Sequence, residues 1–207
     1  GKTVISAFDY RRYAETRGEL PSLLFVAHRE EILKQSLITF RNVLRDANFG
    51  DMYTGNHQPK QYKHLFVTVQ TLHSKNWMSA TDPSAYEFLI IDEFHHAEAP
   101  TYRSILDHFM PKILLGLTAT PERMDGKNVL RFFDDRIAAE IRLPEAIERR
   151  LLCPFHYFGI TDLEEMDLRG LRWSRGGYDR AQLSNLYSMQ GHVSRRRASL
   201  VADSVRR

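Results

Sequence analysis

Four short apolar runs separated by longer amphipathic stretches limit the folds open to this chain. The runs are Leu23–Ala27, Leu65–Val69, Phe88–Ile91 and Ile113–Leu117. Runs of this length, apolar almost throughout, are typical of strands buried on both faces. Their alternation with helical segments predicts an α/β fold with a mostly parallel sheet and helices on both faces. Ala138 to Leu143 is a candidate for a fifth strand.

The stretches between these runs have helical spacing. Leu33, Leu37, Phe40 and Leu44 lie four, three and four residues apart, as on one face of a helix. Another helix begins near Val4, Ile5 and Phe8, and shorter ones are expected at 126–133 and 144–151. Pro100 suits the first turn of a further helix, which Pro111 helps to stop and whose core side holds Tyr102, Ile105, Leu106 and Phe109.

The pattern changes after Pro154. Residues 155–160 suit one more strand, 161–177 a linker or irregular extension, and 180–207 a final helix. We therefore expect a main domain over 1–153 and an extension over 154–207.

Composition sets wide limits on partners and location. The net charge of +3 permits nucleic-acid binding without requiring it. The one cysteine, Cys153, cannot form an internal disulfide, which suits a reducing cytoplasm. No apolar run approaches the roughly 20 residues that span a bilayer, so we expect no membrane partner.

Gly1-Lys2-Thr3 matches the last three residues of the phosphate-binding loop GxxxxGK[ST]. In such loops the lysine reaches the β- and γ-phosphates and the hydroxyl holds Mg²⁺. An apolar helical stretch follows at once, as a phosphate site at a helix N-terminus requires. The three residues alone are a weak signal, and a chain that starts here looks truncated or processed.

Asp92 and Glu93 follow the apolar run that ends at Ile91. They would lie at the carboxyl end of a central strand, where open α/β sheets bind ligands. One carboxylate there can hold Mg²⁺ and a neighbour can orient water toward a γ-phosphate. A polar strand end or a helix cap would explain the pair equally well.

Five segments occur in an order that is a more specific signal of function than any one segment alone. Gly1-Lys2-Thr3 is followed by Val26-Ala27-His28-Arg29-Glu30-Glu31, Val67-Thr68-Val69-Gln70-Thr71-Leu72, Ile91-Asp92-Glu93-Phe94-His95-His96 and Gly116-Leu117-Thr118-Ala119-Thr120-Pro121-Glu122-Arg123. Over about residues 1–150 this order resembles the first RecA-like lobe of superfamily 2 DEAD/DEAH-like helicases, with motifs I, Ia, Ib/Ic, II and III. It is similar to restriction- and repair-type helicases, including the type III restriction Res subunit.

The resemblance implies an ATP site that uses Mg²⁺. By its terms Gly1 and Lys2 bind the phosphates, Thr3 and Asp92 hold Mg²⁺, and Glu93 activates the attacking water. His95, at the last position of a DEAH-type box, would sense the nucleotide. Lys2, Asp92 and Glu93 would be the catalytic residues of an ATP hydrolase.

The resemblance also implies contacts to nucleic acid, DNA in preference to RNA. The family touches the strand backbone at positions that match His28, Arg29, Gln70 and Thr71, although helix capping would explain any one of them. The family couples hydrolysis to strand movement at positions that match Thr118, Ala119 and Thr120.

Some features depart from this pattern or stay open. Phe94 stands where alanine is usual, which argues against the strict DEAD-box RNA group. His96 has no assigned role, and a structural histidine explains it. Arg123 would face the nucleotide or cap a loop. Some bacterial relatives carry a phospholipase-D-like nuclease domain, so a linked nuclease is a candidate partner.

We see no second set of alternating strands, and therefore expect the second RecA-like lobe elsewhere in a longer polypeptide. Because that lobe supplies an arginine finger, the chain alone would hydrolyse ATP negligibly. Two alternatives remain: a nucleic-acid clamp with this fold but no productive ATPase activity, and a P-loop ATPase that moves protein.

Overall fold

We describe a computed structural model of the chain over residues 1–74, 77–120, 129–155, 171–174, 177–179, 181–182 and 184. Residues 1–140 form one compact unit and 141–207 form another, and each is described by itself. The domain boundary after residue 153 stays a prediction. The described part contains no helix long and apolar enough to cross a membrane. The cytoplasmic location also stays a prediction.

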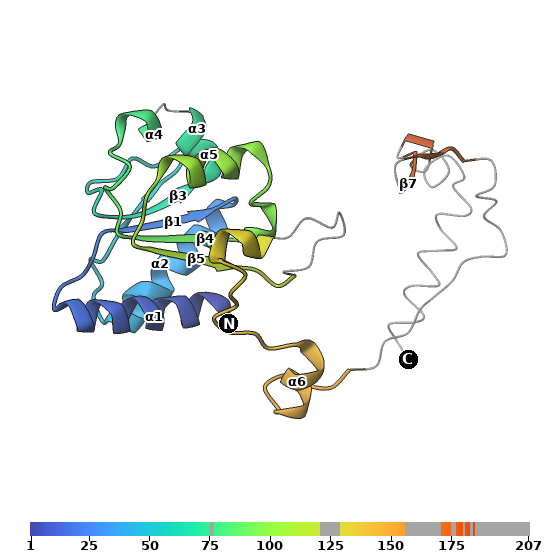
Figure 1. Cartoon of the computed structure of the whole chain (residues 1–207), viewed down its shortest axis with the longest axis horizontal. Coiled ribbons are helices and arrows are strands. Elements are labelled where there is room, and N and C mark those ends of the chain that lie inside the picture. Colours follow the sequence, from blue (N-terminus) through green and yellow to red (C-terminus); the bar gives the residue numbers. More distant parts are fainter. Residues whose placement is uncertain are drawn as a thin grey trace. The chain divides into compact units, whose positions relative to one another are not determined.

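The first unit is built on a five-stranded, all-parallel sheet with the strand order β2-β3-β1-β4-β5 (Figure 1). The strands are β1 (Leu23–Ala27), β2 (Asp51–Tyr53), β3 (His64–Thr68), β4 (Phe88–Asp92) and β5 (Ile113–Leu117). Every residue of β1, β3 and β4 is buried, as expected for strands covered on both faces. The four strands predicted from continuous apolar runs are confirmed.

The fifth strand is not where we expected it. Residues 138–142 form no strand, and Leu143 begins a helix. The fifth strand of the sheet is instead β2, a three-residue edge strand that starts with a charged residue, Asp51. An edge strand needs only one hydrogen-bonded neighbour, so it does not need a long apolar run.

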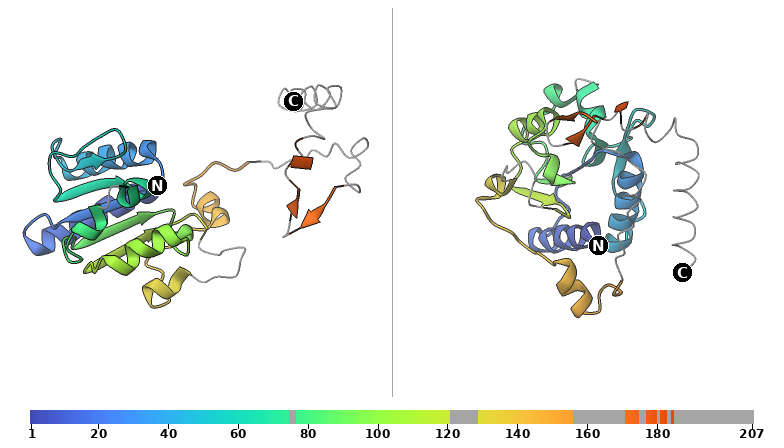
Figure 2. Two further views of the ribbon diagram at one scale, coloured as in Figure 1. Left: turned by 90° about the horizontal axis from the view of Figure 1, so that it is seen from above. Right: turned by 90° about the vertical axis from the view of Figure 1, so that its right-hand side faces the viewer.

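Helices cover both faces of the sheet (Figures 1 and 2). One face packs against α1 (Lys2–Arg17) and α2 (Glu30–Leu44), through a core that includes Tyr10, Phe40 and Phe25. The other packs against α3 (Val69–Ser74), α4 (Trp77–Ala80) and α5 (Pro100–His108). Strand side chains alternate between the two cores, as the pleat requires.

The helices predicted near Val4, over Leu33–Leu44 and from Pro100 are present, with one difference in how α1 packs. The expected core side of the helix at Pro100 is buried at Tyr102, Ile105 and Phe109. In α1, however, the buried side chains are Ser6, Ala7, Tyr10 and Ala14, while Val4, Ile5 and Phe8 are exposed. The apolar residues that begin α1 therefore do not define its core face.

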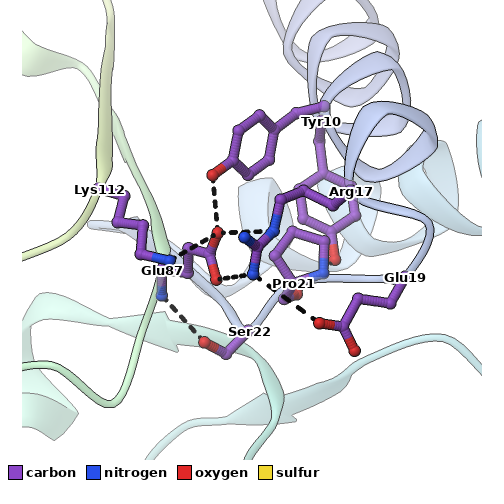
Figure 3. A network of polar contacts seen from close by, with 8 residues as sticks. Tyr10, Arg17, Glu19, Pro21, Ser22, Glu87 and Lys112 are labelled. Carbon is purple, nitrogen blue, oxygen red and sulfur yellow. Dashed lines mark hydrogen bonds and ion pairs between the residues drawn. The ribbon is translucent and has the colours of Figure 1, made fainter.

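A polar cluster around Glu87 joins α1 to the amino edge of the sheet (Figure 3). The Glu87 carboxylate accepts a hydrogen bond of 2.7 Å from Tyr13 Oη and forms ion pairs with Arg17 (3.2 Å) and Lys112 (3.4 Å). Its backbone N–H donates to Ser22 Oγ. These contacts anchor the last turns of α1 beside the residues that precede β1, β4 and β5.

Two short 3₁₀ helices, η1 (Phe94–His96) and η2 (Val129–Phe133), complete the described part of the first unit. The helix expected over 126–133 is described only from residue 129. In the second unit, α6 (Leu143–Glu148) lies where a helix was expected over 144–151.

Within the expected linker, β6 (Trp173–Ser174) pairs antiparallel with β7 (Gly177–Tyr178), so that segment is not wholly irregular. The strand expected over 155–160 and the helix expected over 180–207 lie almost wholly outside the described residues.

Candidate functional site

Most of the candidate site residues from the sequence analysis lie at the carboxyl edge of the sheet. Because all five strands are parallel, the residues that follow β1, β3, β4 and β5 meet at one edge. The register sets Ala27 beside Thr68 and Asp92 beside Leu117, so His28, Gln70, Glu93 and Thr118 all follow strand ends there. This edge is where open α/β sheets bind ligands.

Lys2 reaches the acidic residues across this edge. Its Nζ lies 3.5 Å from Glu93 Oε1, although 91 positions separate the two residues. Lys2 is the first residue of α1, and Thr3 is the second. The free N–H groups of a helix N-terminus favour negative charge, so a cationic side chain, a helix end and two carboxylates converge here.

Asp92 is the last residue of β4 and is only 6% exposed. Its Oδ1 accepts a 2.9 Å hydrogen bond from the backbone N–H of Glu93. Burial raises the pKa of Asp92, and the charge of Lys2 opposes that rise in part. A buried carboxylate that makes few hydrogen bonds has most to gain from a nearby cation.

Glu93 has a left-handed backbone, with φ 52° and ψ 50°. For a residue other than glycine this costs on the order of 1 kcal/mol or more, and such strain gathers at functional sites. The conformation turns the chain sharply from β4 into η1. It leaves the Glu93 carboxylate between Lys2 on one side and His95 on the other.

His95 connects this acidic residue to β5. Its Nδ1 lies 3.2 Å from Glu93 Oε2 and 3.2 Å from Thr118 Oγ1. Thr118 Oγ1 also accepts a 3.1 Å hydrogen bond from the backbone N–H of Thr120. Ala119 and Thr120 are exposed. The loop after β5 is therefore linked to the Glu93 carboxylate through one imidazole ring.

The four residues expected to touch nucleic acid differ in their surroundings. Gln70 Nε2 donates to the backbone oxygen of His28 (3.3 Å), so the residues after β1 and β3 lie together, and Arg29 beside them is exposed. Thr71 is only 2% exposed, and its hydroxyl shares a 2.8 Å hydrogen bond with Thr68 Oγ1. The Thr71 side chain thus stabilises the start of α3 and does not face solvent.

Phe94 is a buried core residue, which the sequence alone did not indicate. It is 1% exposed, and its ring lies 4.7 Å from that of Phe133 in η2. A Cβ atom built on Gly116 would lie 2.7 Å from Phe94 Cγ. Glycine in β5 therefore leaves the room that a phenylalanine in this position needs. Arg123 lies outside the described residues.

The parallel sheet, with helices on both faces, has the RecA-like fold. The family model described as "Type III restriction enzyme, res subunit" matches residues 1–123. The chain belongs to this family, and its fold is that of the first RecA-like lobe of superfamily 2 helicases.

Several curated relatives carry helicase names, and one is a restriction endonuclease subunit. The chain is 29% identical to "Putative ATP-dependent helicase IRC3" of Saccharomyces cerevisiae over 90% of its own length and 28% of that protein. It is 32% identical to the type I restriction enzyme EcoAI endonuclease subunit of Escherichia coli, over 47% of this chain and 12% of that one. The chain thus spans well under half the length of these relatives.

A solved structure shares the fold. The Hef helicase domain of Pyrococcus furiosus matches with a TM-score of 0.52 and 22% identity, over 65% of this chain and 31% of that chain. At this level of identity the match supports the RecA-like fold alone.

Proposed function

We propose that this chain is the ATP-binding lobe of a motor that couples ATP hydrolysis to movement on nucleic acid. The observation that carries the proposal is the approach of Lys2 Nζ to Glu93 Oε1 within 3.5 Å. It joins the end of a phosphate-binding loop to the acidic pair at one strand end. Such an arrangement can hold a triphosphate between a lysine and a magnesium-binding carboxylate.

The residues at this edge suit Mg²⁺ and ATP. Mg²⁺ prefers oxygen ligands and is commonly held by one or two carboxylates together with substrate phosphates. Thr3 and Asp92 would hold the ion, while Gly1 and Lys2 would contact the phosphates. Bound Mg²⁺ would neutralise charge that develops on the phosphate oxygens. The buried Asp92 carboxylate supports this assignment, because a cation would offset the cost of its burial.

Glu93 would orient and activate the attacking water. Lys2 holds one of its oxygens and His95 the other, so the carboxylate has a defined direction. His95 would carry the state of the nucleotide to Thr118, and from there to Ala119 and Thr120. This route would link hydrolysis to the movement of the loop after β5.

His28, Arg29 and Gln70 would contact the backbone of the strand. Contacts of this kind position a nucleic acid without reading its sequence. Thr71 would act indirectly, by fixing the start of α3. We propose DNA in preference to RNA, and the name of one relative, the DNA 3'-5' translocase XPB2 of Sulfurisphaera tokodaii, supports that preference.

A second RecA-like lobe of the same polypeptide would complete the site, and a linked nuclease domain is a further candidate partner. The relationship to a restriction endonuclease subunit supports the latter. Without an arginine from the second lobe, we expect this chain alone to hydrolyse ATP at least 10³-fold more slowly than the complete motor.

The test is Glu93→Gln in the protein that carries both lobes. ATP turnover with single-stranded DNA should fall by roughly 10²–10⁴-fold while ATP binding is retained. Glu98→Gln, which removes a nearby carboxylate that pairs with Arg103, is the matched control. If the wild-type protein binds nucleic acid but never hydrolyses ATP, the result supports a nucleic-acid clamp without ATPase activity and contradicts the proposed motor. If nucleic acid leaves wild-type ATP turnover unchanged, a motor acting on protein is favoured.

A further inference from the structure

His96 is an exposed residue at the carboxyl edge of the sheet, and its ring has three ring neighbours. Its ring centroid is 4.1 Å from that of His95, 6.3 Å from that of His28 and 6.1 Å from that of Tyr102. These neighbours come from η1, from the residue after β1, and from α5. We name His28, His95, His96 and Tyr102 the histidine cluster.

The cluster touches both proposed sites. At one end His95 Nδ1 lies 3.2 Å from Glu93 Oε2 and from Thr118 Oγ1. At the other end the His28 backbone oxygen accepts from Gln70, and Arg29 is the next residue. A displacement of His28 by a bound strand would therefore press on His96, and a displacement of His96 would press on His95.

Two polar atoms of the cluster are buried without a hydrogen-bond partner among the residues that the structure describes. They are His28 Nδ1 and Tyr102 Oη. Burial, with the carboxylates of Asp92 and Glu93 nearby, raises the pKa of Tyr102 to about 12, so its hydroxyl keeps its proton and can donate.

Buried polar atoms are nearly always paired, and an unpaired one favours any rearrangement that supplies a partner. The cluster therefore has a reason to adopt a second arrangement. Coupling between two sites requires an element of this kind, whose equilibrium both sites can bias.

We propose that His96 couples nucleic-acid binding at His28 to ATP binding and hydrolysis at Glu93. It is a positioning residue that acts through the rings of His28 and His95. This proposal rests on the proposed function, because it needs both ligands. The alternative is that His96 is only an exposed surface residue beside Tyr102 and takes no part in coupling.

The experiment measures the coupling itself. In the protein with both lobes, the dissociation constant for oligothymidylate is measured with and without a non-hydrolysable ATP analogue and Mg²⁺. In wild type the analogue should change that constant by at least about fivefold. In His96→Phe, which keeps a ring but no nitrogen, and in His96→Gln, which keeps polarity but no ring, the change should fall below about twofold.

His73→Gln is the matched control, since His73 contacts α5 through the backbone oxygen of Thr101 but is not part of the cluster. It should keep the wild-type coupling. Linkage requires that oligothymidylate change analogue affinity by the same factor, which checks each value independently.

The outcomes separate the two proposals. A wild-type protein that binds neither probe, or shows no coupling, removes the proposed function. If the ATP analogue changes oligothymidylate affinity by the same factor in wild type and in both His96 variants, the role of His96 is overturned and the proposed function is unaffected. Loss of the fold in both His96 variants, judged by circular dichroism, would mean that this exposed residue is needed for folding, and it would also overturn the proposal.

Discussion

Gly116 in β5 faces Phe94 in η1 so closely that a Cβ atom on the glycine would lie 2.7 Å from Phe94 Cγ and 2.6 Å from Phe133 Cζ. The space that a side chain would occupy at Gly116 is filled by two aromatic rings. The phenylalanine after the acidic pair and the glycine before Thr118 thus form one packing unit, which fixes the two segments beside each other.

Gly116→Ala should therefore lower the free energy of unfolding by about 1–3 kcal/mol, because the rings or the strand must move. Phe94→Ala should cost about 3–5 kcal/mol by opening a cavity. In the Phe94→Ala background, Gly116→Ala should lower the free energy of unfolding by less than it does in wild type. Urea unfolding measures all three values.

Gly55→Ala is the control for this series, since a Cβ atom there would meet nothing within 4 Å. It should leave stability within about 0.5 kcal/mol of wild type. A neutral Gly116→Ala would contradict the packing account.

Glu87→Gln should destabilise the chain at neutral pH. The hydrogen bond from Tyr13, with help from Arg17 and Lys112, lowers the pKa of Glu87 below 4.5 in the folded state. A lowered carboxyl pKa contributes stability that is present above the unfolded pKa and is lost as the pH falls through the folded value. We expect a deficit of about 2 kcal/mol at pH 7 that shrinks as the pH falls below the ordinary value of 4.5 and disappears below the lowered folded pKa.

This prediction is checked by urea unfolding of both proteins from pH 3 to pH 7. Glu19→Gln serves as control, because that side chain is more exposed and pairs only with Arg17 among the described contacts. A deficit that did not depend on pH would mean that packing, and not charge, explains the role of Glu87.

His64 should make the fold sensitive to mild acid. Burial, with a smaller effect from Lys63, lowers its pKa from 6.5 to about 4, and its ring stacks on Phe49 at 4.5 Å. Between these values the unfolded chain binds a proton that the folded chain does not, so stability falls as the pH falls from about 6.5 toward 4. The loss attributable to His64 is roughly 3 kcal/mol.

His64→Leu should remove most of this slope in unfolding free energy between pH 7 and pH 4. His57→Leu, at a more exposed histidine, is the comparison. If the slope persisted in His64→Leu and disappeared in His57→Leu, the assignment to His64 would be wrong.

Asp92→Asn should stabilise the chain when no Mg²⁺ or nucleotide is present. Burial raises the pKa of Asp92, so the ionised side chain costs stability above its folded pKa, and this cost vanishes below its ordinary value of 3.8. At pH 7 the gain should be on the order of 1 kcal/mol, and at pH 3 the two proteins should match. Asp107→Asn, at an exposed position, should show no such gain.

Much of the sheet could be predicted because strands covered on both faces leave an unmistakable pattern of continuous apolar residues. That pattern failed for β2, whose three residues begin with Asp51 and which is paired on one side only. It also failed at 138–143, where apolar residues lie outside the sheet. Composition cannot show whether a neighbouring strand is available, and strand formation depends on that neighbour.

The residues of the candidate site could be predicted from the order of the segments along the chain, but their surroundings could not. The left-handed backbone of Glu93, the burial of Thr71 and the packing of Phe94 against Gly116 all depend on neighbours from other elements. His96 is the clearest case, since its ring neighbours include His28 and Tyr102. Only Gly116 offered a signal, as a glycine inside a strand often marks a close approach.

The central claim is that Lys2 and Asp92 act on one magnesium nucleotide, and a double-mutant cycle on ATP affinity tests it most directly. In the protein with both lobes, the dissociation constant for ATP is measured with Mg²⁺ and with EDTA for wild type, Lys2→Ala, Asp92→Asn and the double variant, with Lys34→Ala as control. We predict that each single change weakens ATP binding in Mg²⁺ at least about tenfold. The double variant should bind ATP more weakly than wild type by less than the product of the two single-variant factors. In Asp92→Asn the affinity for ATP should no longer depend on Mg²⁺. Strictly multiplicative effects, or Mg²⁺ dependence retained in Asp92→Asn, would contradict a shared site.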